Sequence, residues 1–147
     1  MGPEMRVPIT KTKILIADDD DSVRCSVGKA LRGEGFLVTE CSDGGTALAL
    51  CSNGDFDVII IDLQMPCLSG WEAIELITRE VPQSRVIVFT GEPNQKVFAE
   101  ASGASALVEK PVEMEVLCGL VQALASQSIE ERVERLSGRI EIPVVNV

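Results

Sequence analysis

The chain has 147 residues, 46% of them hydrophobic, and a formal net charge of −10, so it can build one domain of ordinary size around an apolar core. This acidity argues against nucleic-acid binding through its own surface, because phosphate backbones are bound by lysine and arginine. It contains no histidine, which excludes Ser-His-Asp and Cys-His catalysis, His-ligated zinc and a phosphohistidine on this chain.

The five cysteines are scattered without a C-x-x-C pair, at Cys25, Cys41, Cys51, Cys67 and Cys118. This pattern predicts small free thiols in a reducing cytosol rather than a disulfide framework or a metal site. Residues 1–11 lack the apolar segment of a signal peptide, and no apolar run approaches the ~18 residues that cross a bilayer. We therefore expect a cytoplasmic protein that makes no membrane contact.

In its first half the chain alternates apolar strands with helices. Residues 14–17 form a continuous apolar run that ends in four aspartates, and 22–32 then carry apolar side chains on one helical face. A weaker strand signal at 36–40 precedes a short helix rich in alanine and leucine at 44–51. A second continuous apolar run covers 58–61 and ends at an aspartate.

The same alternation continues in the second half. Residues 71–80 have apolar positions at helical spacing, and 86–89 form a third apolar run that ends at a threonine. A helix is predicted at 94–101, directly after a proline, which suits a first-turn position. A weaker strand at 106–108 and an apolar helix at 112–125 complete the series.

Five strands, each followed by a helix, predict a (βα)5 architecture of the α/β class. Continuous apolar strands are expected where helices cover both faces of a parallel sheet. Right-handed crossovers then favour a doubly wound parallel five-stranded sheet in the order 2-1-3-4-5. In such sheets the functional crevice lies beyond the carboxyl ends of the strands, near the first and third.

The predicted globular domain covers residues 11–125, and 126–147 form a C-terminal linker and helical extension. Within the extension, 129–136 is predicted to be a short charged helix whose apolar stripe is barely one heptad, too short for a coiled coil. The final stretch, 141–147, is expected to be a loose tail.

Residues suited to phosphoryl chemistry follow four of the predicted strands, at the edge where the strands end: Asp18 and Asp19, Asp62, Thr90, and Lys110. Three carboxylates at one edge repel one another unless a cation lies among them, and Mg²⁺ prefers oxygen ligands of this kind. A carboxylate can act as a nucleophile toward a phosphoryl group, whose charge a lysine and a hydroxyl can stabilise. The pattern therefore predicts phosphoryl transfer to an aspartate.

Four segments carry a closer signature when they are taken in order. They are ILIADDD at 14–20, DLQMPCLSG at 62–70, VIVFTG at 86–91 and GASALVEKP at 103–111. Each alone is a weak signal, but all four in order, each at the end of a predicted strand, are specific. Over residues 11–125 the chain resembles the response-regulator receiver domains of two-component signalling, which have the CheY-like fold.

This resemblance implies a phosphoacceptor and a metal site. Asp62 would accept the phosphoryl group, and Asp19 would be a direct Mg²⁺ ligand. Asp18 would act on the metal mainly through water, and Gln64 would offer its backbone carbonyl. Asp62 completes the implied ligand set, and Mg²⁺ is the expected cofactor.

The resemblance also implies how the phosphoryl group is held and where it comes from. Thr90 would donate a hydrogen bond to it and Lys110 would pair with it, and the Lys110–Pro111 peptide bond would be cis. The donor would be a histidine kinase or a histidine phosphotransfer protein, and the signal would pass to a downstream protein target. The chain would be no enzyme beyond its own phosphotransfer and autodephosphorylation, and a homodimer is left open.

Three positions depart from the family's pattern. Leu107 stands where the family usually has an aromatic residue that changes rotamer on activation, and Gly91 stands where alanine or serine is usual. The interval from Thr90 to Lys110 is also about two residues shorter than usual. We therefore expect the switch to depend on residues 91–95 and the helix after them rather than on the side chain of Leu107.

Three other functions stay open at this stage. The acids after the first strand resemble the first motif of haloacid-dehalogenase-type phosphatases, in which Asp19 would be the nucleophile. A flavodoxin-like nucleotide-binding module has the same fold, although the aspartates at 18–21 would repel a phosphate. A receiver-like scaffold that takes no phosphate is the third.

Overall fold

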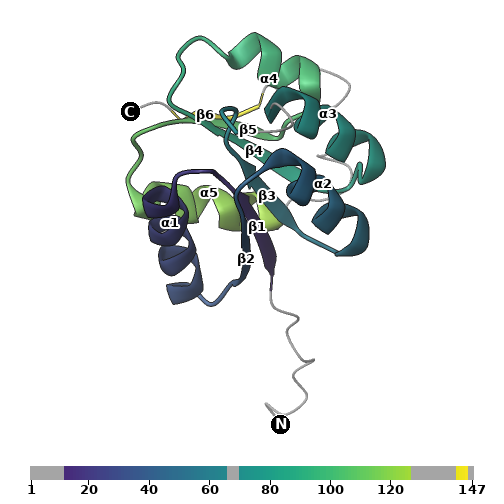
Figure 1. Cartoon of the computed structure of the whole chain (residues 1–147). Helices are drawn as coiled ribbons and strands as arrows, with labels where there is room; N and C mark the ends of the chain where they lie inside the picture. The colour runs from purple at the N-terminus through teal and green to yellow at the C-terminus, as the bar shows by residue number, and fades with distance from the viewer. Residues whose placement is uncertain (1–11, 66–69, 127–141, 146–147) are drawn as a thin grey trace, which may run out of the picture.

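The computed structural model describes residues 12–65, 70–126 and 142–145, which form a parallel sheet covered by helices on both faces (Figure 1). The strand order is β2-β1-β3-β4-β5-β6, so the order predicted for the first five strands is confirmed. The strands are β1 (Lys13–Ala17), β2 (Leu37–Cys41), β3 (Val58–Ile61), β4 (Arg85–Thr90), β5 (Ala106–Glu109) and β6 (Val144–Val145).

In the part of the chain that the structure describes, five helices connect and cover the strands: α1 (Asp21–Gly33), α2 (Gly44–Asn53), α3 (Gly70–Glu80), α4 (Lys96–Ser102) and α5 (Met114–Ala125). Helices α1 and α5 pack on one face of the sheet, whereas α2, α3 and α4 pack on the other (Figure 1). Two buried apolar clusters result, one on each face. Among the described residues, no helix is long and apolar enough to cross a membrane.

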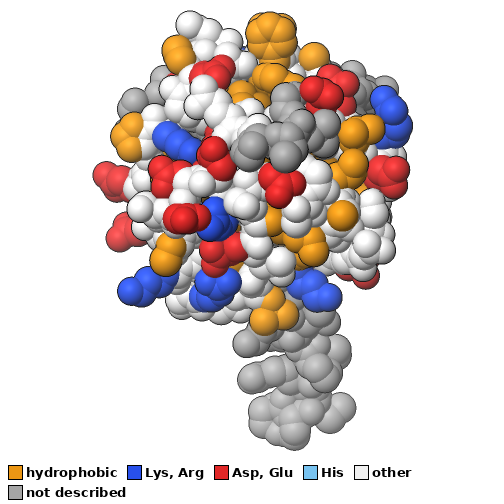
Figure 2. Space-filling model, in the orientation of Figure 1, with side chains coloured by type: hydrophobic (Ala, Val, Ile, Leu, Met, Phe, Trp, Pro, Cys, Tyr) orange, Lys and Arg blue, Asp and Glu red, His pale blue; other side chains and the backbone are white. Residues whose placement is uncertain are grey.

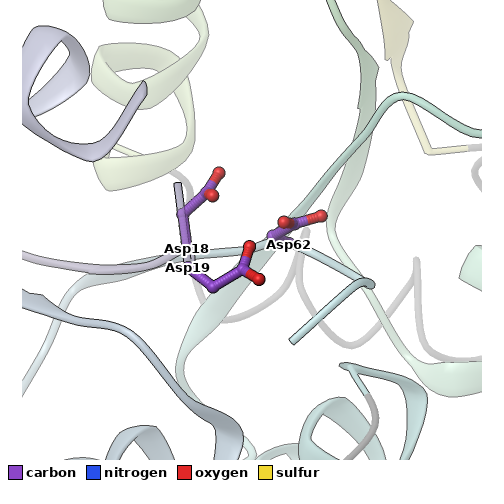
Figure 3. A group of neighbouring side chains, drawn as sticks. All are labelled: Asp18, Asp19 and Asp62. Carbon is purple, nitrogen blue, oxygen red and sulfur yellow. The ribbon is translucent and has the colours of Figure 1, made fainter. Parts of the chain in front are cut away.

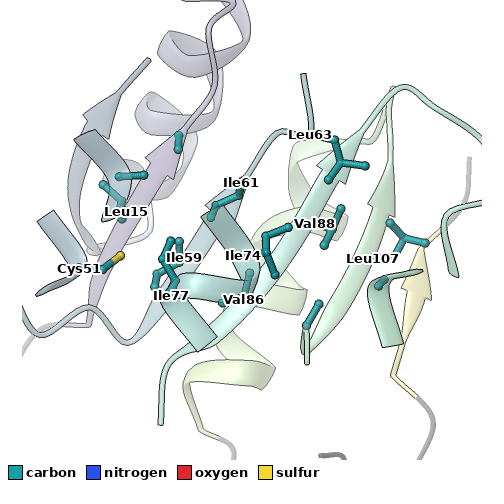
Figure 4. Close-up of a cluster of buried hydrophobic side chains, with 14 of the residues drawn as sticks. Leu15, Cys51, Ile59, Ile61, Leu63, Ile74, Ile77, Val86, Val88 and Leu107 are labelled. Carbon is teal, nitrogen blue, oxygen red and sulfur yellow. The ribbon is translucent and has the colours of Figure 1, made fainter. Parts of the chain in front are cut away.

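The central strands are apolar throughout because both of their faces are covered. All four residues of β3 are fully buried, and so are residues 14–17 of β1. Their alternate side chains supply both clusters, and Figure 4 shows the one beneath α2, α3 and α4. Strand β2 lies at an edge, and its burial alternates along the strand, which explains why its sequence signal was weaker.

Helix α4 begins later than the sequence predicted. The expected start at residue 94 is wrong, because Asn94 has a φ of 62°, in the left-handed region that a right-handed helix excludes. The helix runs from Lys96 to Ser102 and ends at Gly103, whose φ of 87° suits a glycine C-cap. The residues before α4 therefore form a longer loop than expected, from Gly91 to Gln95.

The C-terminal end adds a strand that the sequence did not predict. Val144 and Val145 pair in parallel with Leu107 and Val108 of β5, so the expectation of a loose tail is wrong for this part. The predicted helix at 129–136 lies outside the described residues. The division of the chain at residue 125 remains a prediction.

Helices α3 and α4 are in contact through two aromatic side chains. The ring of Trp71, near the start of α3, lies 6.1 Å from the ring of Phe98 in α4, with the planes tilted by 48°. Trp71 is half-buried, whereas Phe98 is 58% exposed. The contact joins the helix that follows the β3 loop to the helix that follows the β4 loop.

Candidate functional site

The three predicted acids meet at the carboxyl ends of β1 and β3. The backbone N–H of Asp62 donates to the carbonyl of Ala17 at 2.9 Å, and that of Asp18 donates to Cys41 at 3.1 Å, so the sheet ladder fixes both. Side-chain oxygens of Asp18, Asp19 and Asp62 lie within 4.8 Å of one another, and Figure 3 shows them close together. The sequence therefore located this cluster correctly.

Burial and charge act together on Asp62. Asp62 is 5% exposed and Asp18 is 1% exposed, whereas Asp19 is open to solvent. Burial raises the pKa of Asp62 to about 6, and the negative charges of Asp18 and Asp19 raise it as well; a hydrogen bond from the N–H of Gln64 and the charge of Lys110 lower it. The ionised form of Asp62 is therefore unfavourable in this structure, and added positive charge at the site would stabilise it.

Lys110 supplies positive charge to the same site from the end of β5. Its Nζ lies 2.8 Å from Oδ2 of Asp18 and 3.7 Å from Oδ2 of Asp62. The same ammonium group lies 4.8 Å from the centre of the Phe89 ring. The Lys110–Pro111 bond is cis, as the resemblance implied.

Thr90 ends β4 beside the acids and is fully buried. Strand β4 is paired with β3, which precedes Asp62, so both residues lie at the same edge of the sheet. The Thr90 hydroxyl accepts a hydrogen bond from the N–H of Glu92 at 2.9 Å. This bond ties the hydroxyl to the loop between β4 and α4.

Gln64 and Glu92 connect the two loops at the site. The amide Nε2 of Gln64 donates to Oε1 of Glu92 at 2.6 Å, and the backbone N–H of Gln64 donates to Asp62 at 3.1 Å. Gln64 was expected to act through its backbone carbonyl, and no role was predicted for Glu92 or Phe89. No pattern in a single sequence pairs residues 28 positions apart, so these contacts emerge only from the fold.

The other two aspartates after β1 have the structural roles expected of a helix start. Asp20 is the N-cap of α1, and its carboxylate accepts hydrogen bonds from the N–H groups of Ser22 and Val23. Asp21 lies in the first turn and forms an ion pair with Arg24. The four consecutive acids therefore divide into two that enter the site and two that begin the helix.

Gly70 supports the loop that carries the phosphoacceptor candidate. A Cβ atom at this position would clash with Cα of Leu63 and would lie 2.7 Å from the carbonyl oxygen of Asp62, both backbone atoms. The N–H of Gly70 also donates to the carbonyl of Leu63 at 3.2 Å. The start of α3 thus packs directly against the backbone at Asp62, and only glycine fits there.

Comparison with known proteins identifies relatives that match most of the chain. The model of the response regulator receiver domain family matches residues 14–122. The CAI-1 autoinducer sensor kinase/phosphatase CqsS of Vibrio cholerae is 29% identical over 126 residues, which cover 80% of this chain and 18% of CqsS. The chemotaxis protein CheY of Pseudomonas aeruginosa is 31% identical over 131 residues, 86% of this chain and 99% of CheY.

Solved structures agree with the relatives found by sequence. The chemotaxis response regulator CheY4 of Vibrio cholerae is 31% identical, covers 78% of this chain and 99% of its own, and superposes with a TM-score of 0.73. Several relatives are much longer, and the chain spans 18% of CqsS and 47% of the transcriptional regulatory protein TcrA of Mycobacterium tuberculosis. On its fold, its acidic site and this match, the chain belongs to the response regulator receiver domain family of two-component signalling.

Proposed function

We propose that Asp62 accepts a phosphoryl group from a phosphohistidine and that the resulting phosphoaspartate switches the conformation of the chain. The observation that carries the proposal is the position of Asp62, a buried carboxylate that lies between two further acids and an ammonium group 3.7 Å away. An oxygen of Asp62 forms the new bond to phosphorus while the bond from phosphorus to the donor's imidazole nitrogen breaks.

The residues around Asp62 fit Mg²⁺. Oxygen atoms of three carboxylates gather within 4.8 Å, and carboxylate oxygens are the ligands that this hard cation prefers. When bound, Mg²⁺ supplies positive charge that offsets the acids and the oxygens of the transferring group. We assign Asp19 and Asp62 as direct ligands, Asp18 as a ligand through water, and the carbonyl of Gln64 as a further oxygen.

Lys110 and Thr90 hold the phosphoryl group in this proposal. The Lys110 ammonium group already bridges Asp18 and Asp62, and it pairs with a phosphoryl oxygen once Asp62 is modified. The Thr90 hydroxyl no longer accepts the hydrogen bond from the N–H of Glu92. It donates a hydrogen bond to a phosphoryl oxygen instead. The two side chains come from neighbouring strands, so the phosphoryl group links β4 and β5 to β3.

The partners follow from the same chemistry. The 147 residues contain no histidine, so the phosphohistidine donor lies outside this sequence, in a histidine kinase or histidine phosphotransfer protein, and a downstream protein receives the signal. The match to a sensor kinase supports such a donor. Acidic and basic side chains are interspersed on the face seen in Figure 2, which favours a protein partner over nucleic acid.

Treatment with a small-molecule phosphodonor and Mg²⁺, followed by peptide mapping, tests the proposal. We expect one acid-stable, base-labile phosphoryl group at Asp62, and none in Asp62→Asn. Asp55→Asn is the matched control, because Asp55 is exposed at the opposite end of β3. An adduct at Asp19 would contradict the proposal and support phosphatase-type chemistry instead, and a chain that takes no phosphate would be a receiver-like scaffold.

A further inference from the structure

The last described residues of the chain lie along the edge of β5. In β6, Val144 pairs in parallel with Leu107 and Val145 pairs with Val108. The backbone N–H of Leu107 donates to the carbonyl of Pro143 at 3.0 Å. Figure 1 shows β6, in yellow, as the outermost strand beside β5. The hydrogen-bonding edge of β5 is therefore covered by residues of the same chain.

One buried side chain anchors this segment. Ile142 is 6% exposed and belongs to the apolar cluster that also holds Leu107, Ala99 and Ala104. Val145 packs against the cluster on the opposite face, whereas Val144 is 39% exposed. A two-residue ladder with one buried anchor side chain is a small contact, and such contacts are among the parts of a protein that open locally before the fold is lost.

The anchor, Ile142, shares its apolar cluster with side chains of β4, the strand that ends at Thr90. Strand β4 pairs with β5, with Val88 opposite Leu107, and Val88 belongs to the cluster of Leu107 and Ile142. Successive side chains of a strand alternate between its faces, so Thr90 lies on the same face as Val88. Figure 4 shows Val88 and Leu107 as neighbours on adjacent strands, with β6 beyond them. Thr90 thus lies on the face of the sheet that carries the cluster of Val88, Leu107 and Ile142.

We propose that residues 142–145 are a displaceable cover of the β5 edge, and that a phosphoryl group on Asp62 releases it. The surface beneath is an edge that accepts an extended apolar strand, and its resident occupant is the chain's own segment. The second half of this inference rests on the proposed function. Movement of Thr90 toward the phosphoryl group changes the packing of Val88 and Leu107. The side chain of Ile142 then leaves the buried cluster that it shares with them.

Ile142→Asp in the full chain tests the cover, because a carboxylate cannot stay in this apolar cluster. We expect amide hydrogen exchange at Leu107 to become at least about tenfold faster, since its hydrogen bond to Pro143 is lost. A synthetic peptide of residues 141–147 should restore protection when added to the variant. Val97→Asp is the control, because Val97 is 73% exposed on α4 and introduces the same charge without touching the anchor.

Two outcomes would overturn the cover: unchanged exchange at Leu107 in Ile142→Asp, or a variant whose lost protection the peptide cannot restore. If Ile142→Asp fails to fold, deletion of 142–147 with the same peptide replaces it. A variant that forms dimers instead of binding the peptide would show that the edge prefers a second copy, and it would contradict the assignment of the segment as occupant.

The link to Asp62 is tested on the unaltered chain with Mg²⁺ and beryllofluoride, which mimics a phosphoryl group on a carboxylate. We expect Leu107 exchange to rise severalfold on binding and, by reciprocity, Ile142→Asp to bind beryllofluoride more tightly than the unaltered chain. Binding at Asp62 without either change would overturn the link alone. No binding at all would contradict the proposed function, while the peptide experiment would still decide on the cover.

Discussion

At the scale of single residues, the position of Asp62 disfavours its ionised form. Asp62 is held in a buried position where its charge is unfavourable, because burial and two neighbouring acids disfavour the carboxylate. The same features let it gain from any positive charge that enters the site. Lys110 offsets part of the negative charge, but its shorter contact is to Asp18 and not to Asp62.

Asp62→Asn should stabilise the chain without metal at neutral pH. The folded pKa of about 6 is above the ordinary value of 3.8, so the folded state binds more protons between these values and the stability due to this group falls as pH rises through them. Loss of the charge should therefore raise the free energy of unfolding by about 1–3 kcal/mol at pH 7 and by much less at pH 4. Urea unfolding at both pH values measures this, and an equal gain at both would contradict it.

Gly70→Ala should damage both the fold and the site. The added methyl group meets backbone atoms of Asp62 and Leu63 that cannot rotate away, so we expect a loss of about 1–3 kcal/mol in unfolding free energy and slower phosphoryl uptake. Gly119→Ala is the matched control. Nothing lies within 4 Å of a Cβ there, and alanine in the interior of α5 should add up to about 1 kcal/mol. Similar effects of the two substitutions would show that the close contact at Gly70 is unimportant.

At the scale of elements, the loop from Gly91 to Gln95 is the part of the site best placed to move. It is joined to Thr90 by the hydrogen bond from the N–H of Glu92, and to the β3 loop by the bond between Gln64 and Glu92. Gly91 is exposed, and a Cβ there would meet nothing within 4 Å. A change at Thr90 therefore reaches this loop first.

Thr90→Ala should abolish the response of this loop, whereas Leu107→Ala should retain it. A phosphoryl group can shift the loop only through a contact that differs between the two states, and the Thr90 hydroxyl supplies that contact. Amide exchange of 91–95 with and without beryllofluoride measures the response in each variant. Thr90→Ser, which keeps the hydroxyl, is the control. A loop that stays unaffected while β5 alone changes protection would refute this account.

The elements show which parts of the fold were predictable. Strands β1, β3 and β4 each contain a continuous apolar run, which is typical of a sheet covered on both faces, and the ends of β1 and β3 located the acids correctly. The predicted start of α4 was wrong because the left-handed backbone of Asn94 leaves no signal in the hydrophobic periodicity. Strand β6 was missed because two valines after a proline are too short to show alternation, and their place is set by β5 and the anchor at Ile142.

At the scale of the whole molecule, part of the excess negative charge is concentrated at one site. The chain carries a net charge of −10, and three of its acids are concentrated at one edge of the sheet, two of them buried. Like charges held together by the fold weaken it, and a bound cation removes that repulsion. The stability of the chain should therefore depend on divalent cations more strongly than its surface composition suggests.

Mg²⁺ should raise the melting temperature, and excess chelator should reverse the rise. We expect a stabilisation of about 1–3 kcal/mol at a Mg²⁺ concentration well above its dissociation constant. Asp19→Asn should reduce this gain most while stabilising the metal-free chain, whereas Asp55→Asn, far from the site, should change neither. Phosphoryl uptake should also stop in chelator. An unchanged rate of uptake without divalent cations would remove the metal from the mechanism.

The contact between Trp71 and Phe98 makes the chain its own optical reporter. Trp71 is the only tryptophan and the chain has no tyrosine, so near-ultraviolet emission comes from one half-buried indole that touches α4. Because α3 starts beside the backbone at Asp62 and α4 follows the loop after Thr90, the helices that follow these two site loops meet at this ring. Stopped-flow fluorescence could then time the conformational response directly on the unlabelled chain, with Phe98→Leu to show how much of the signal arises from the ring pair.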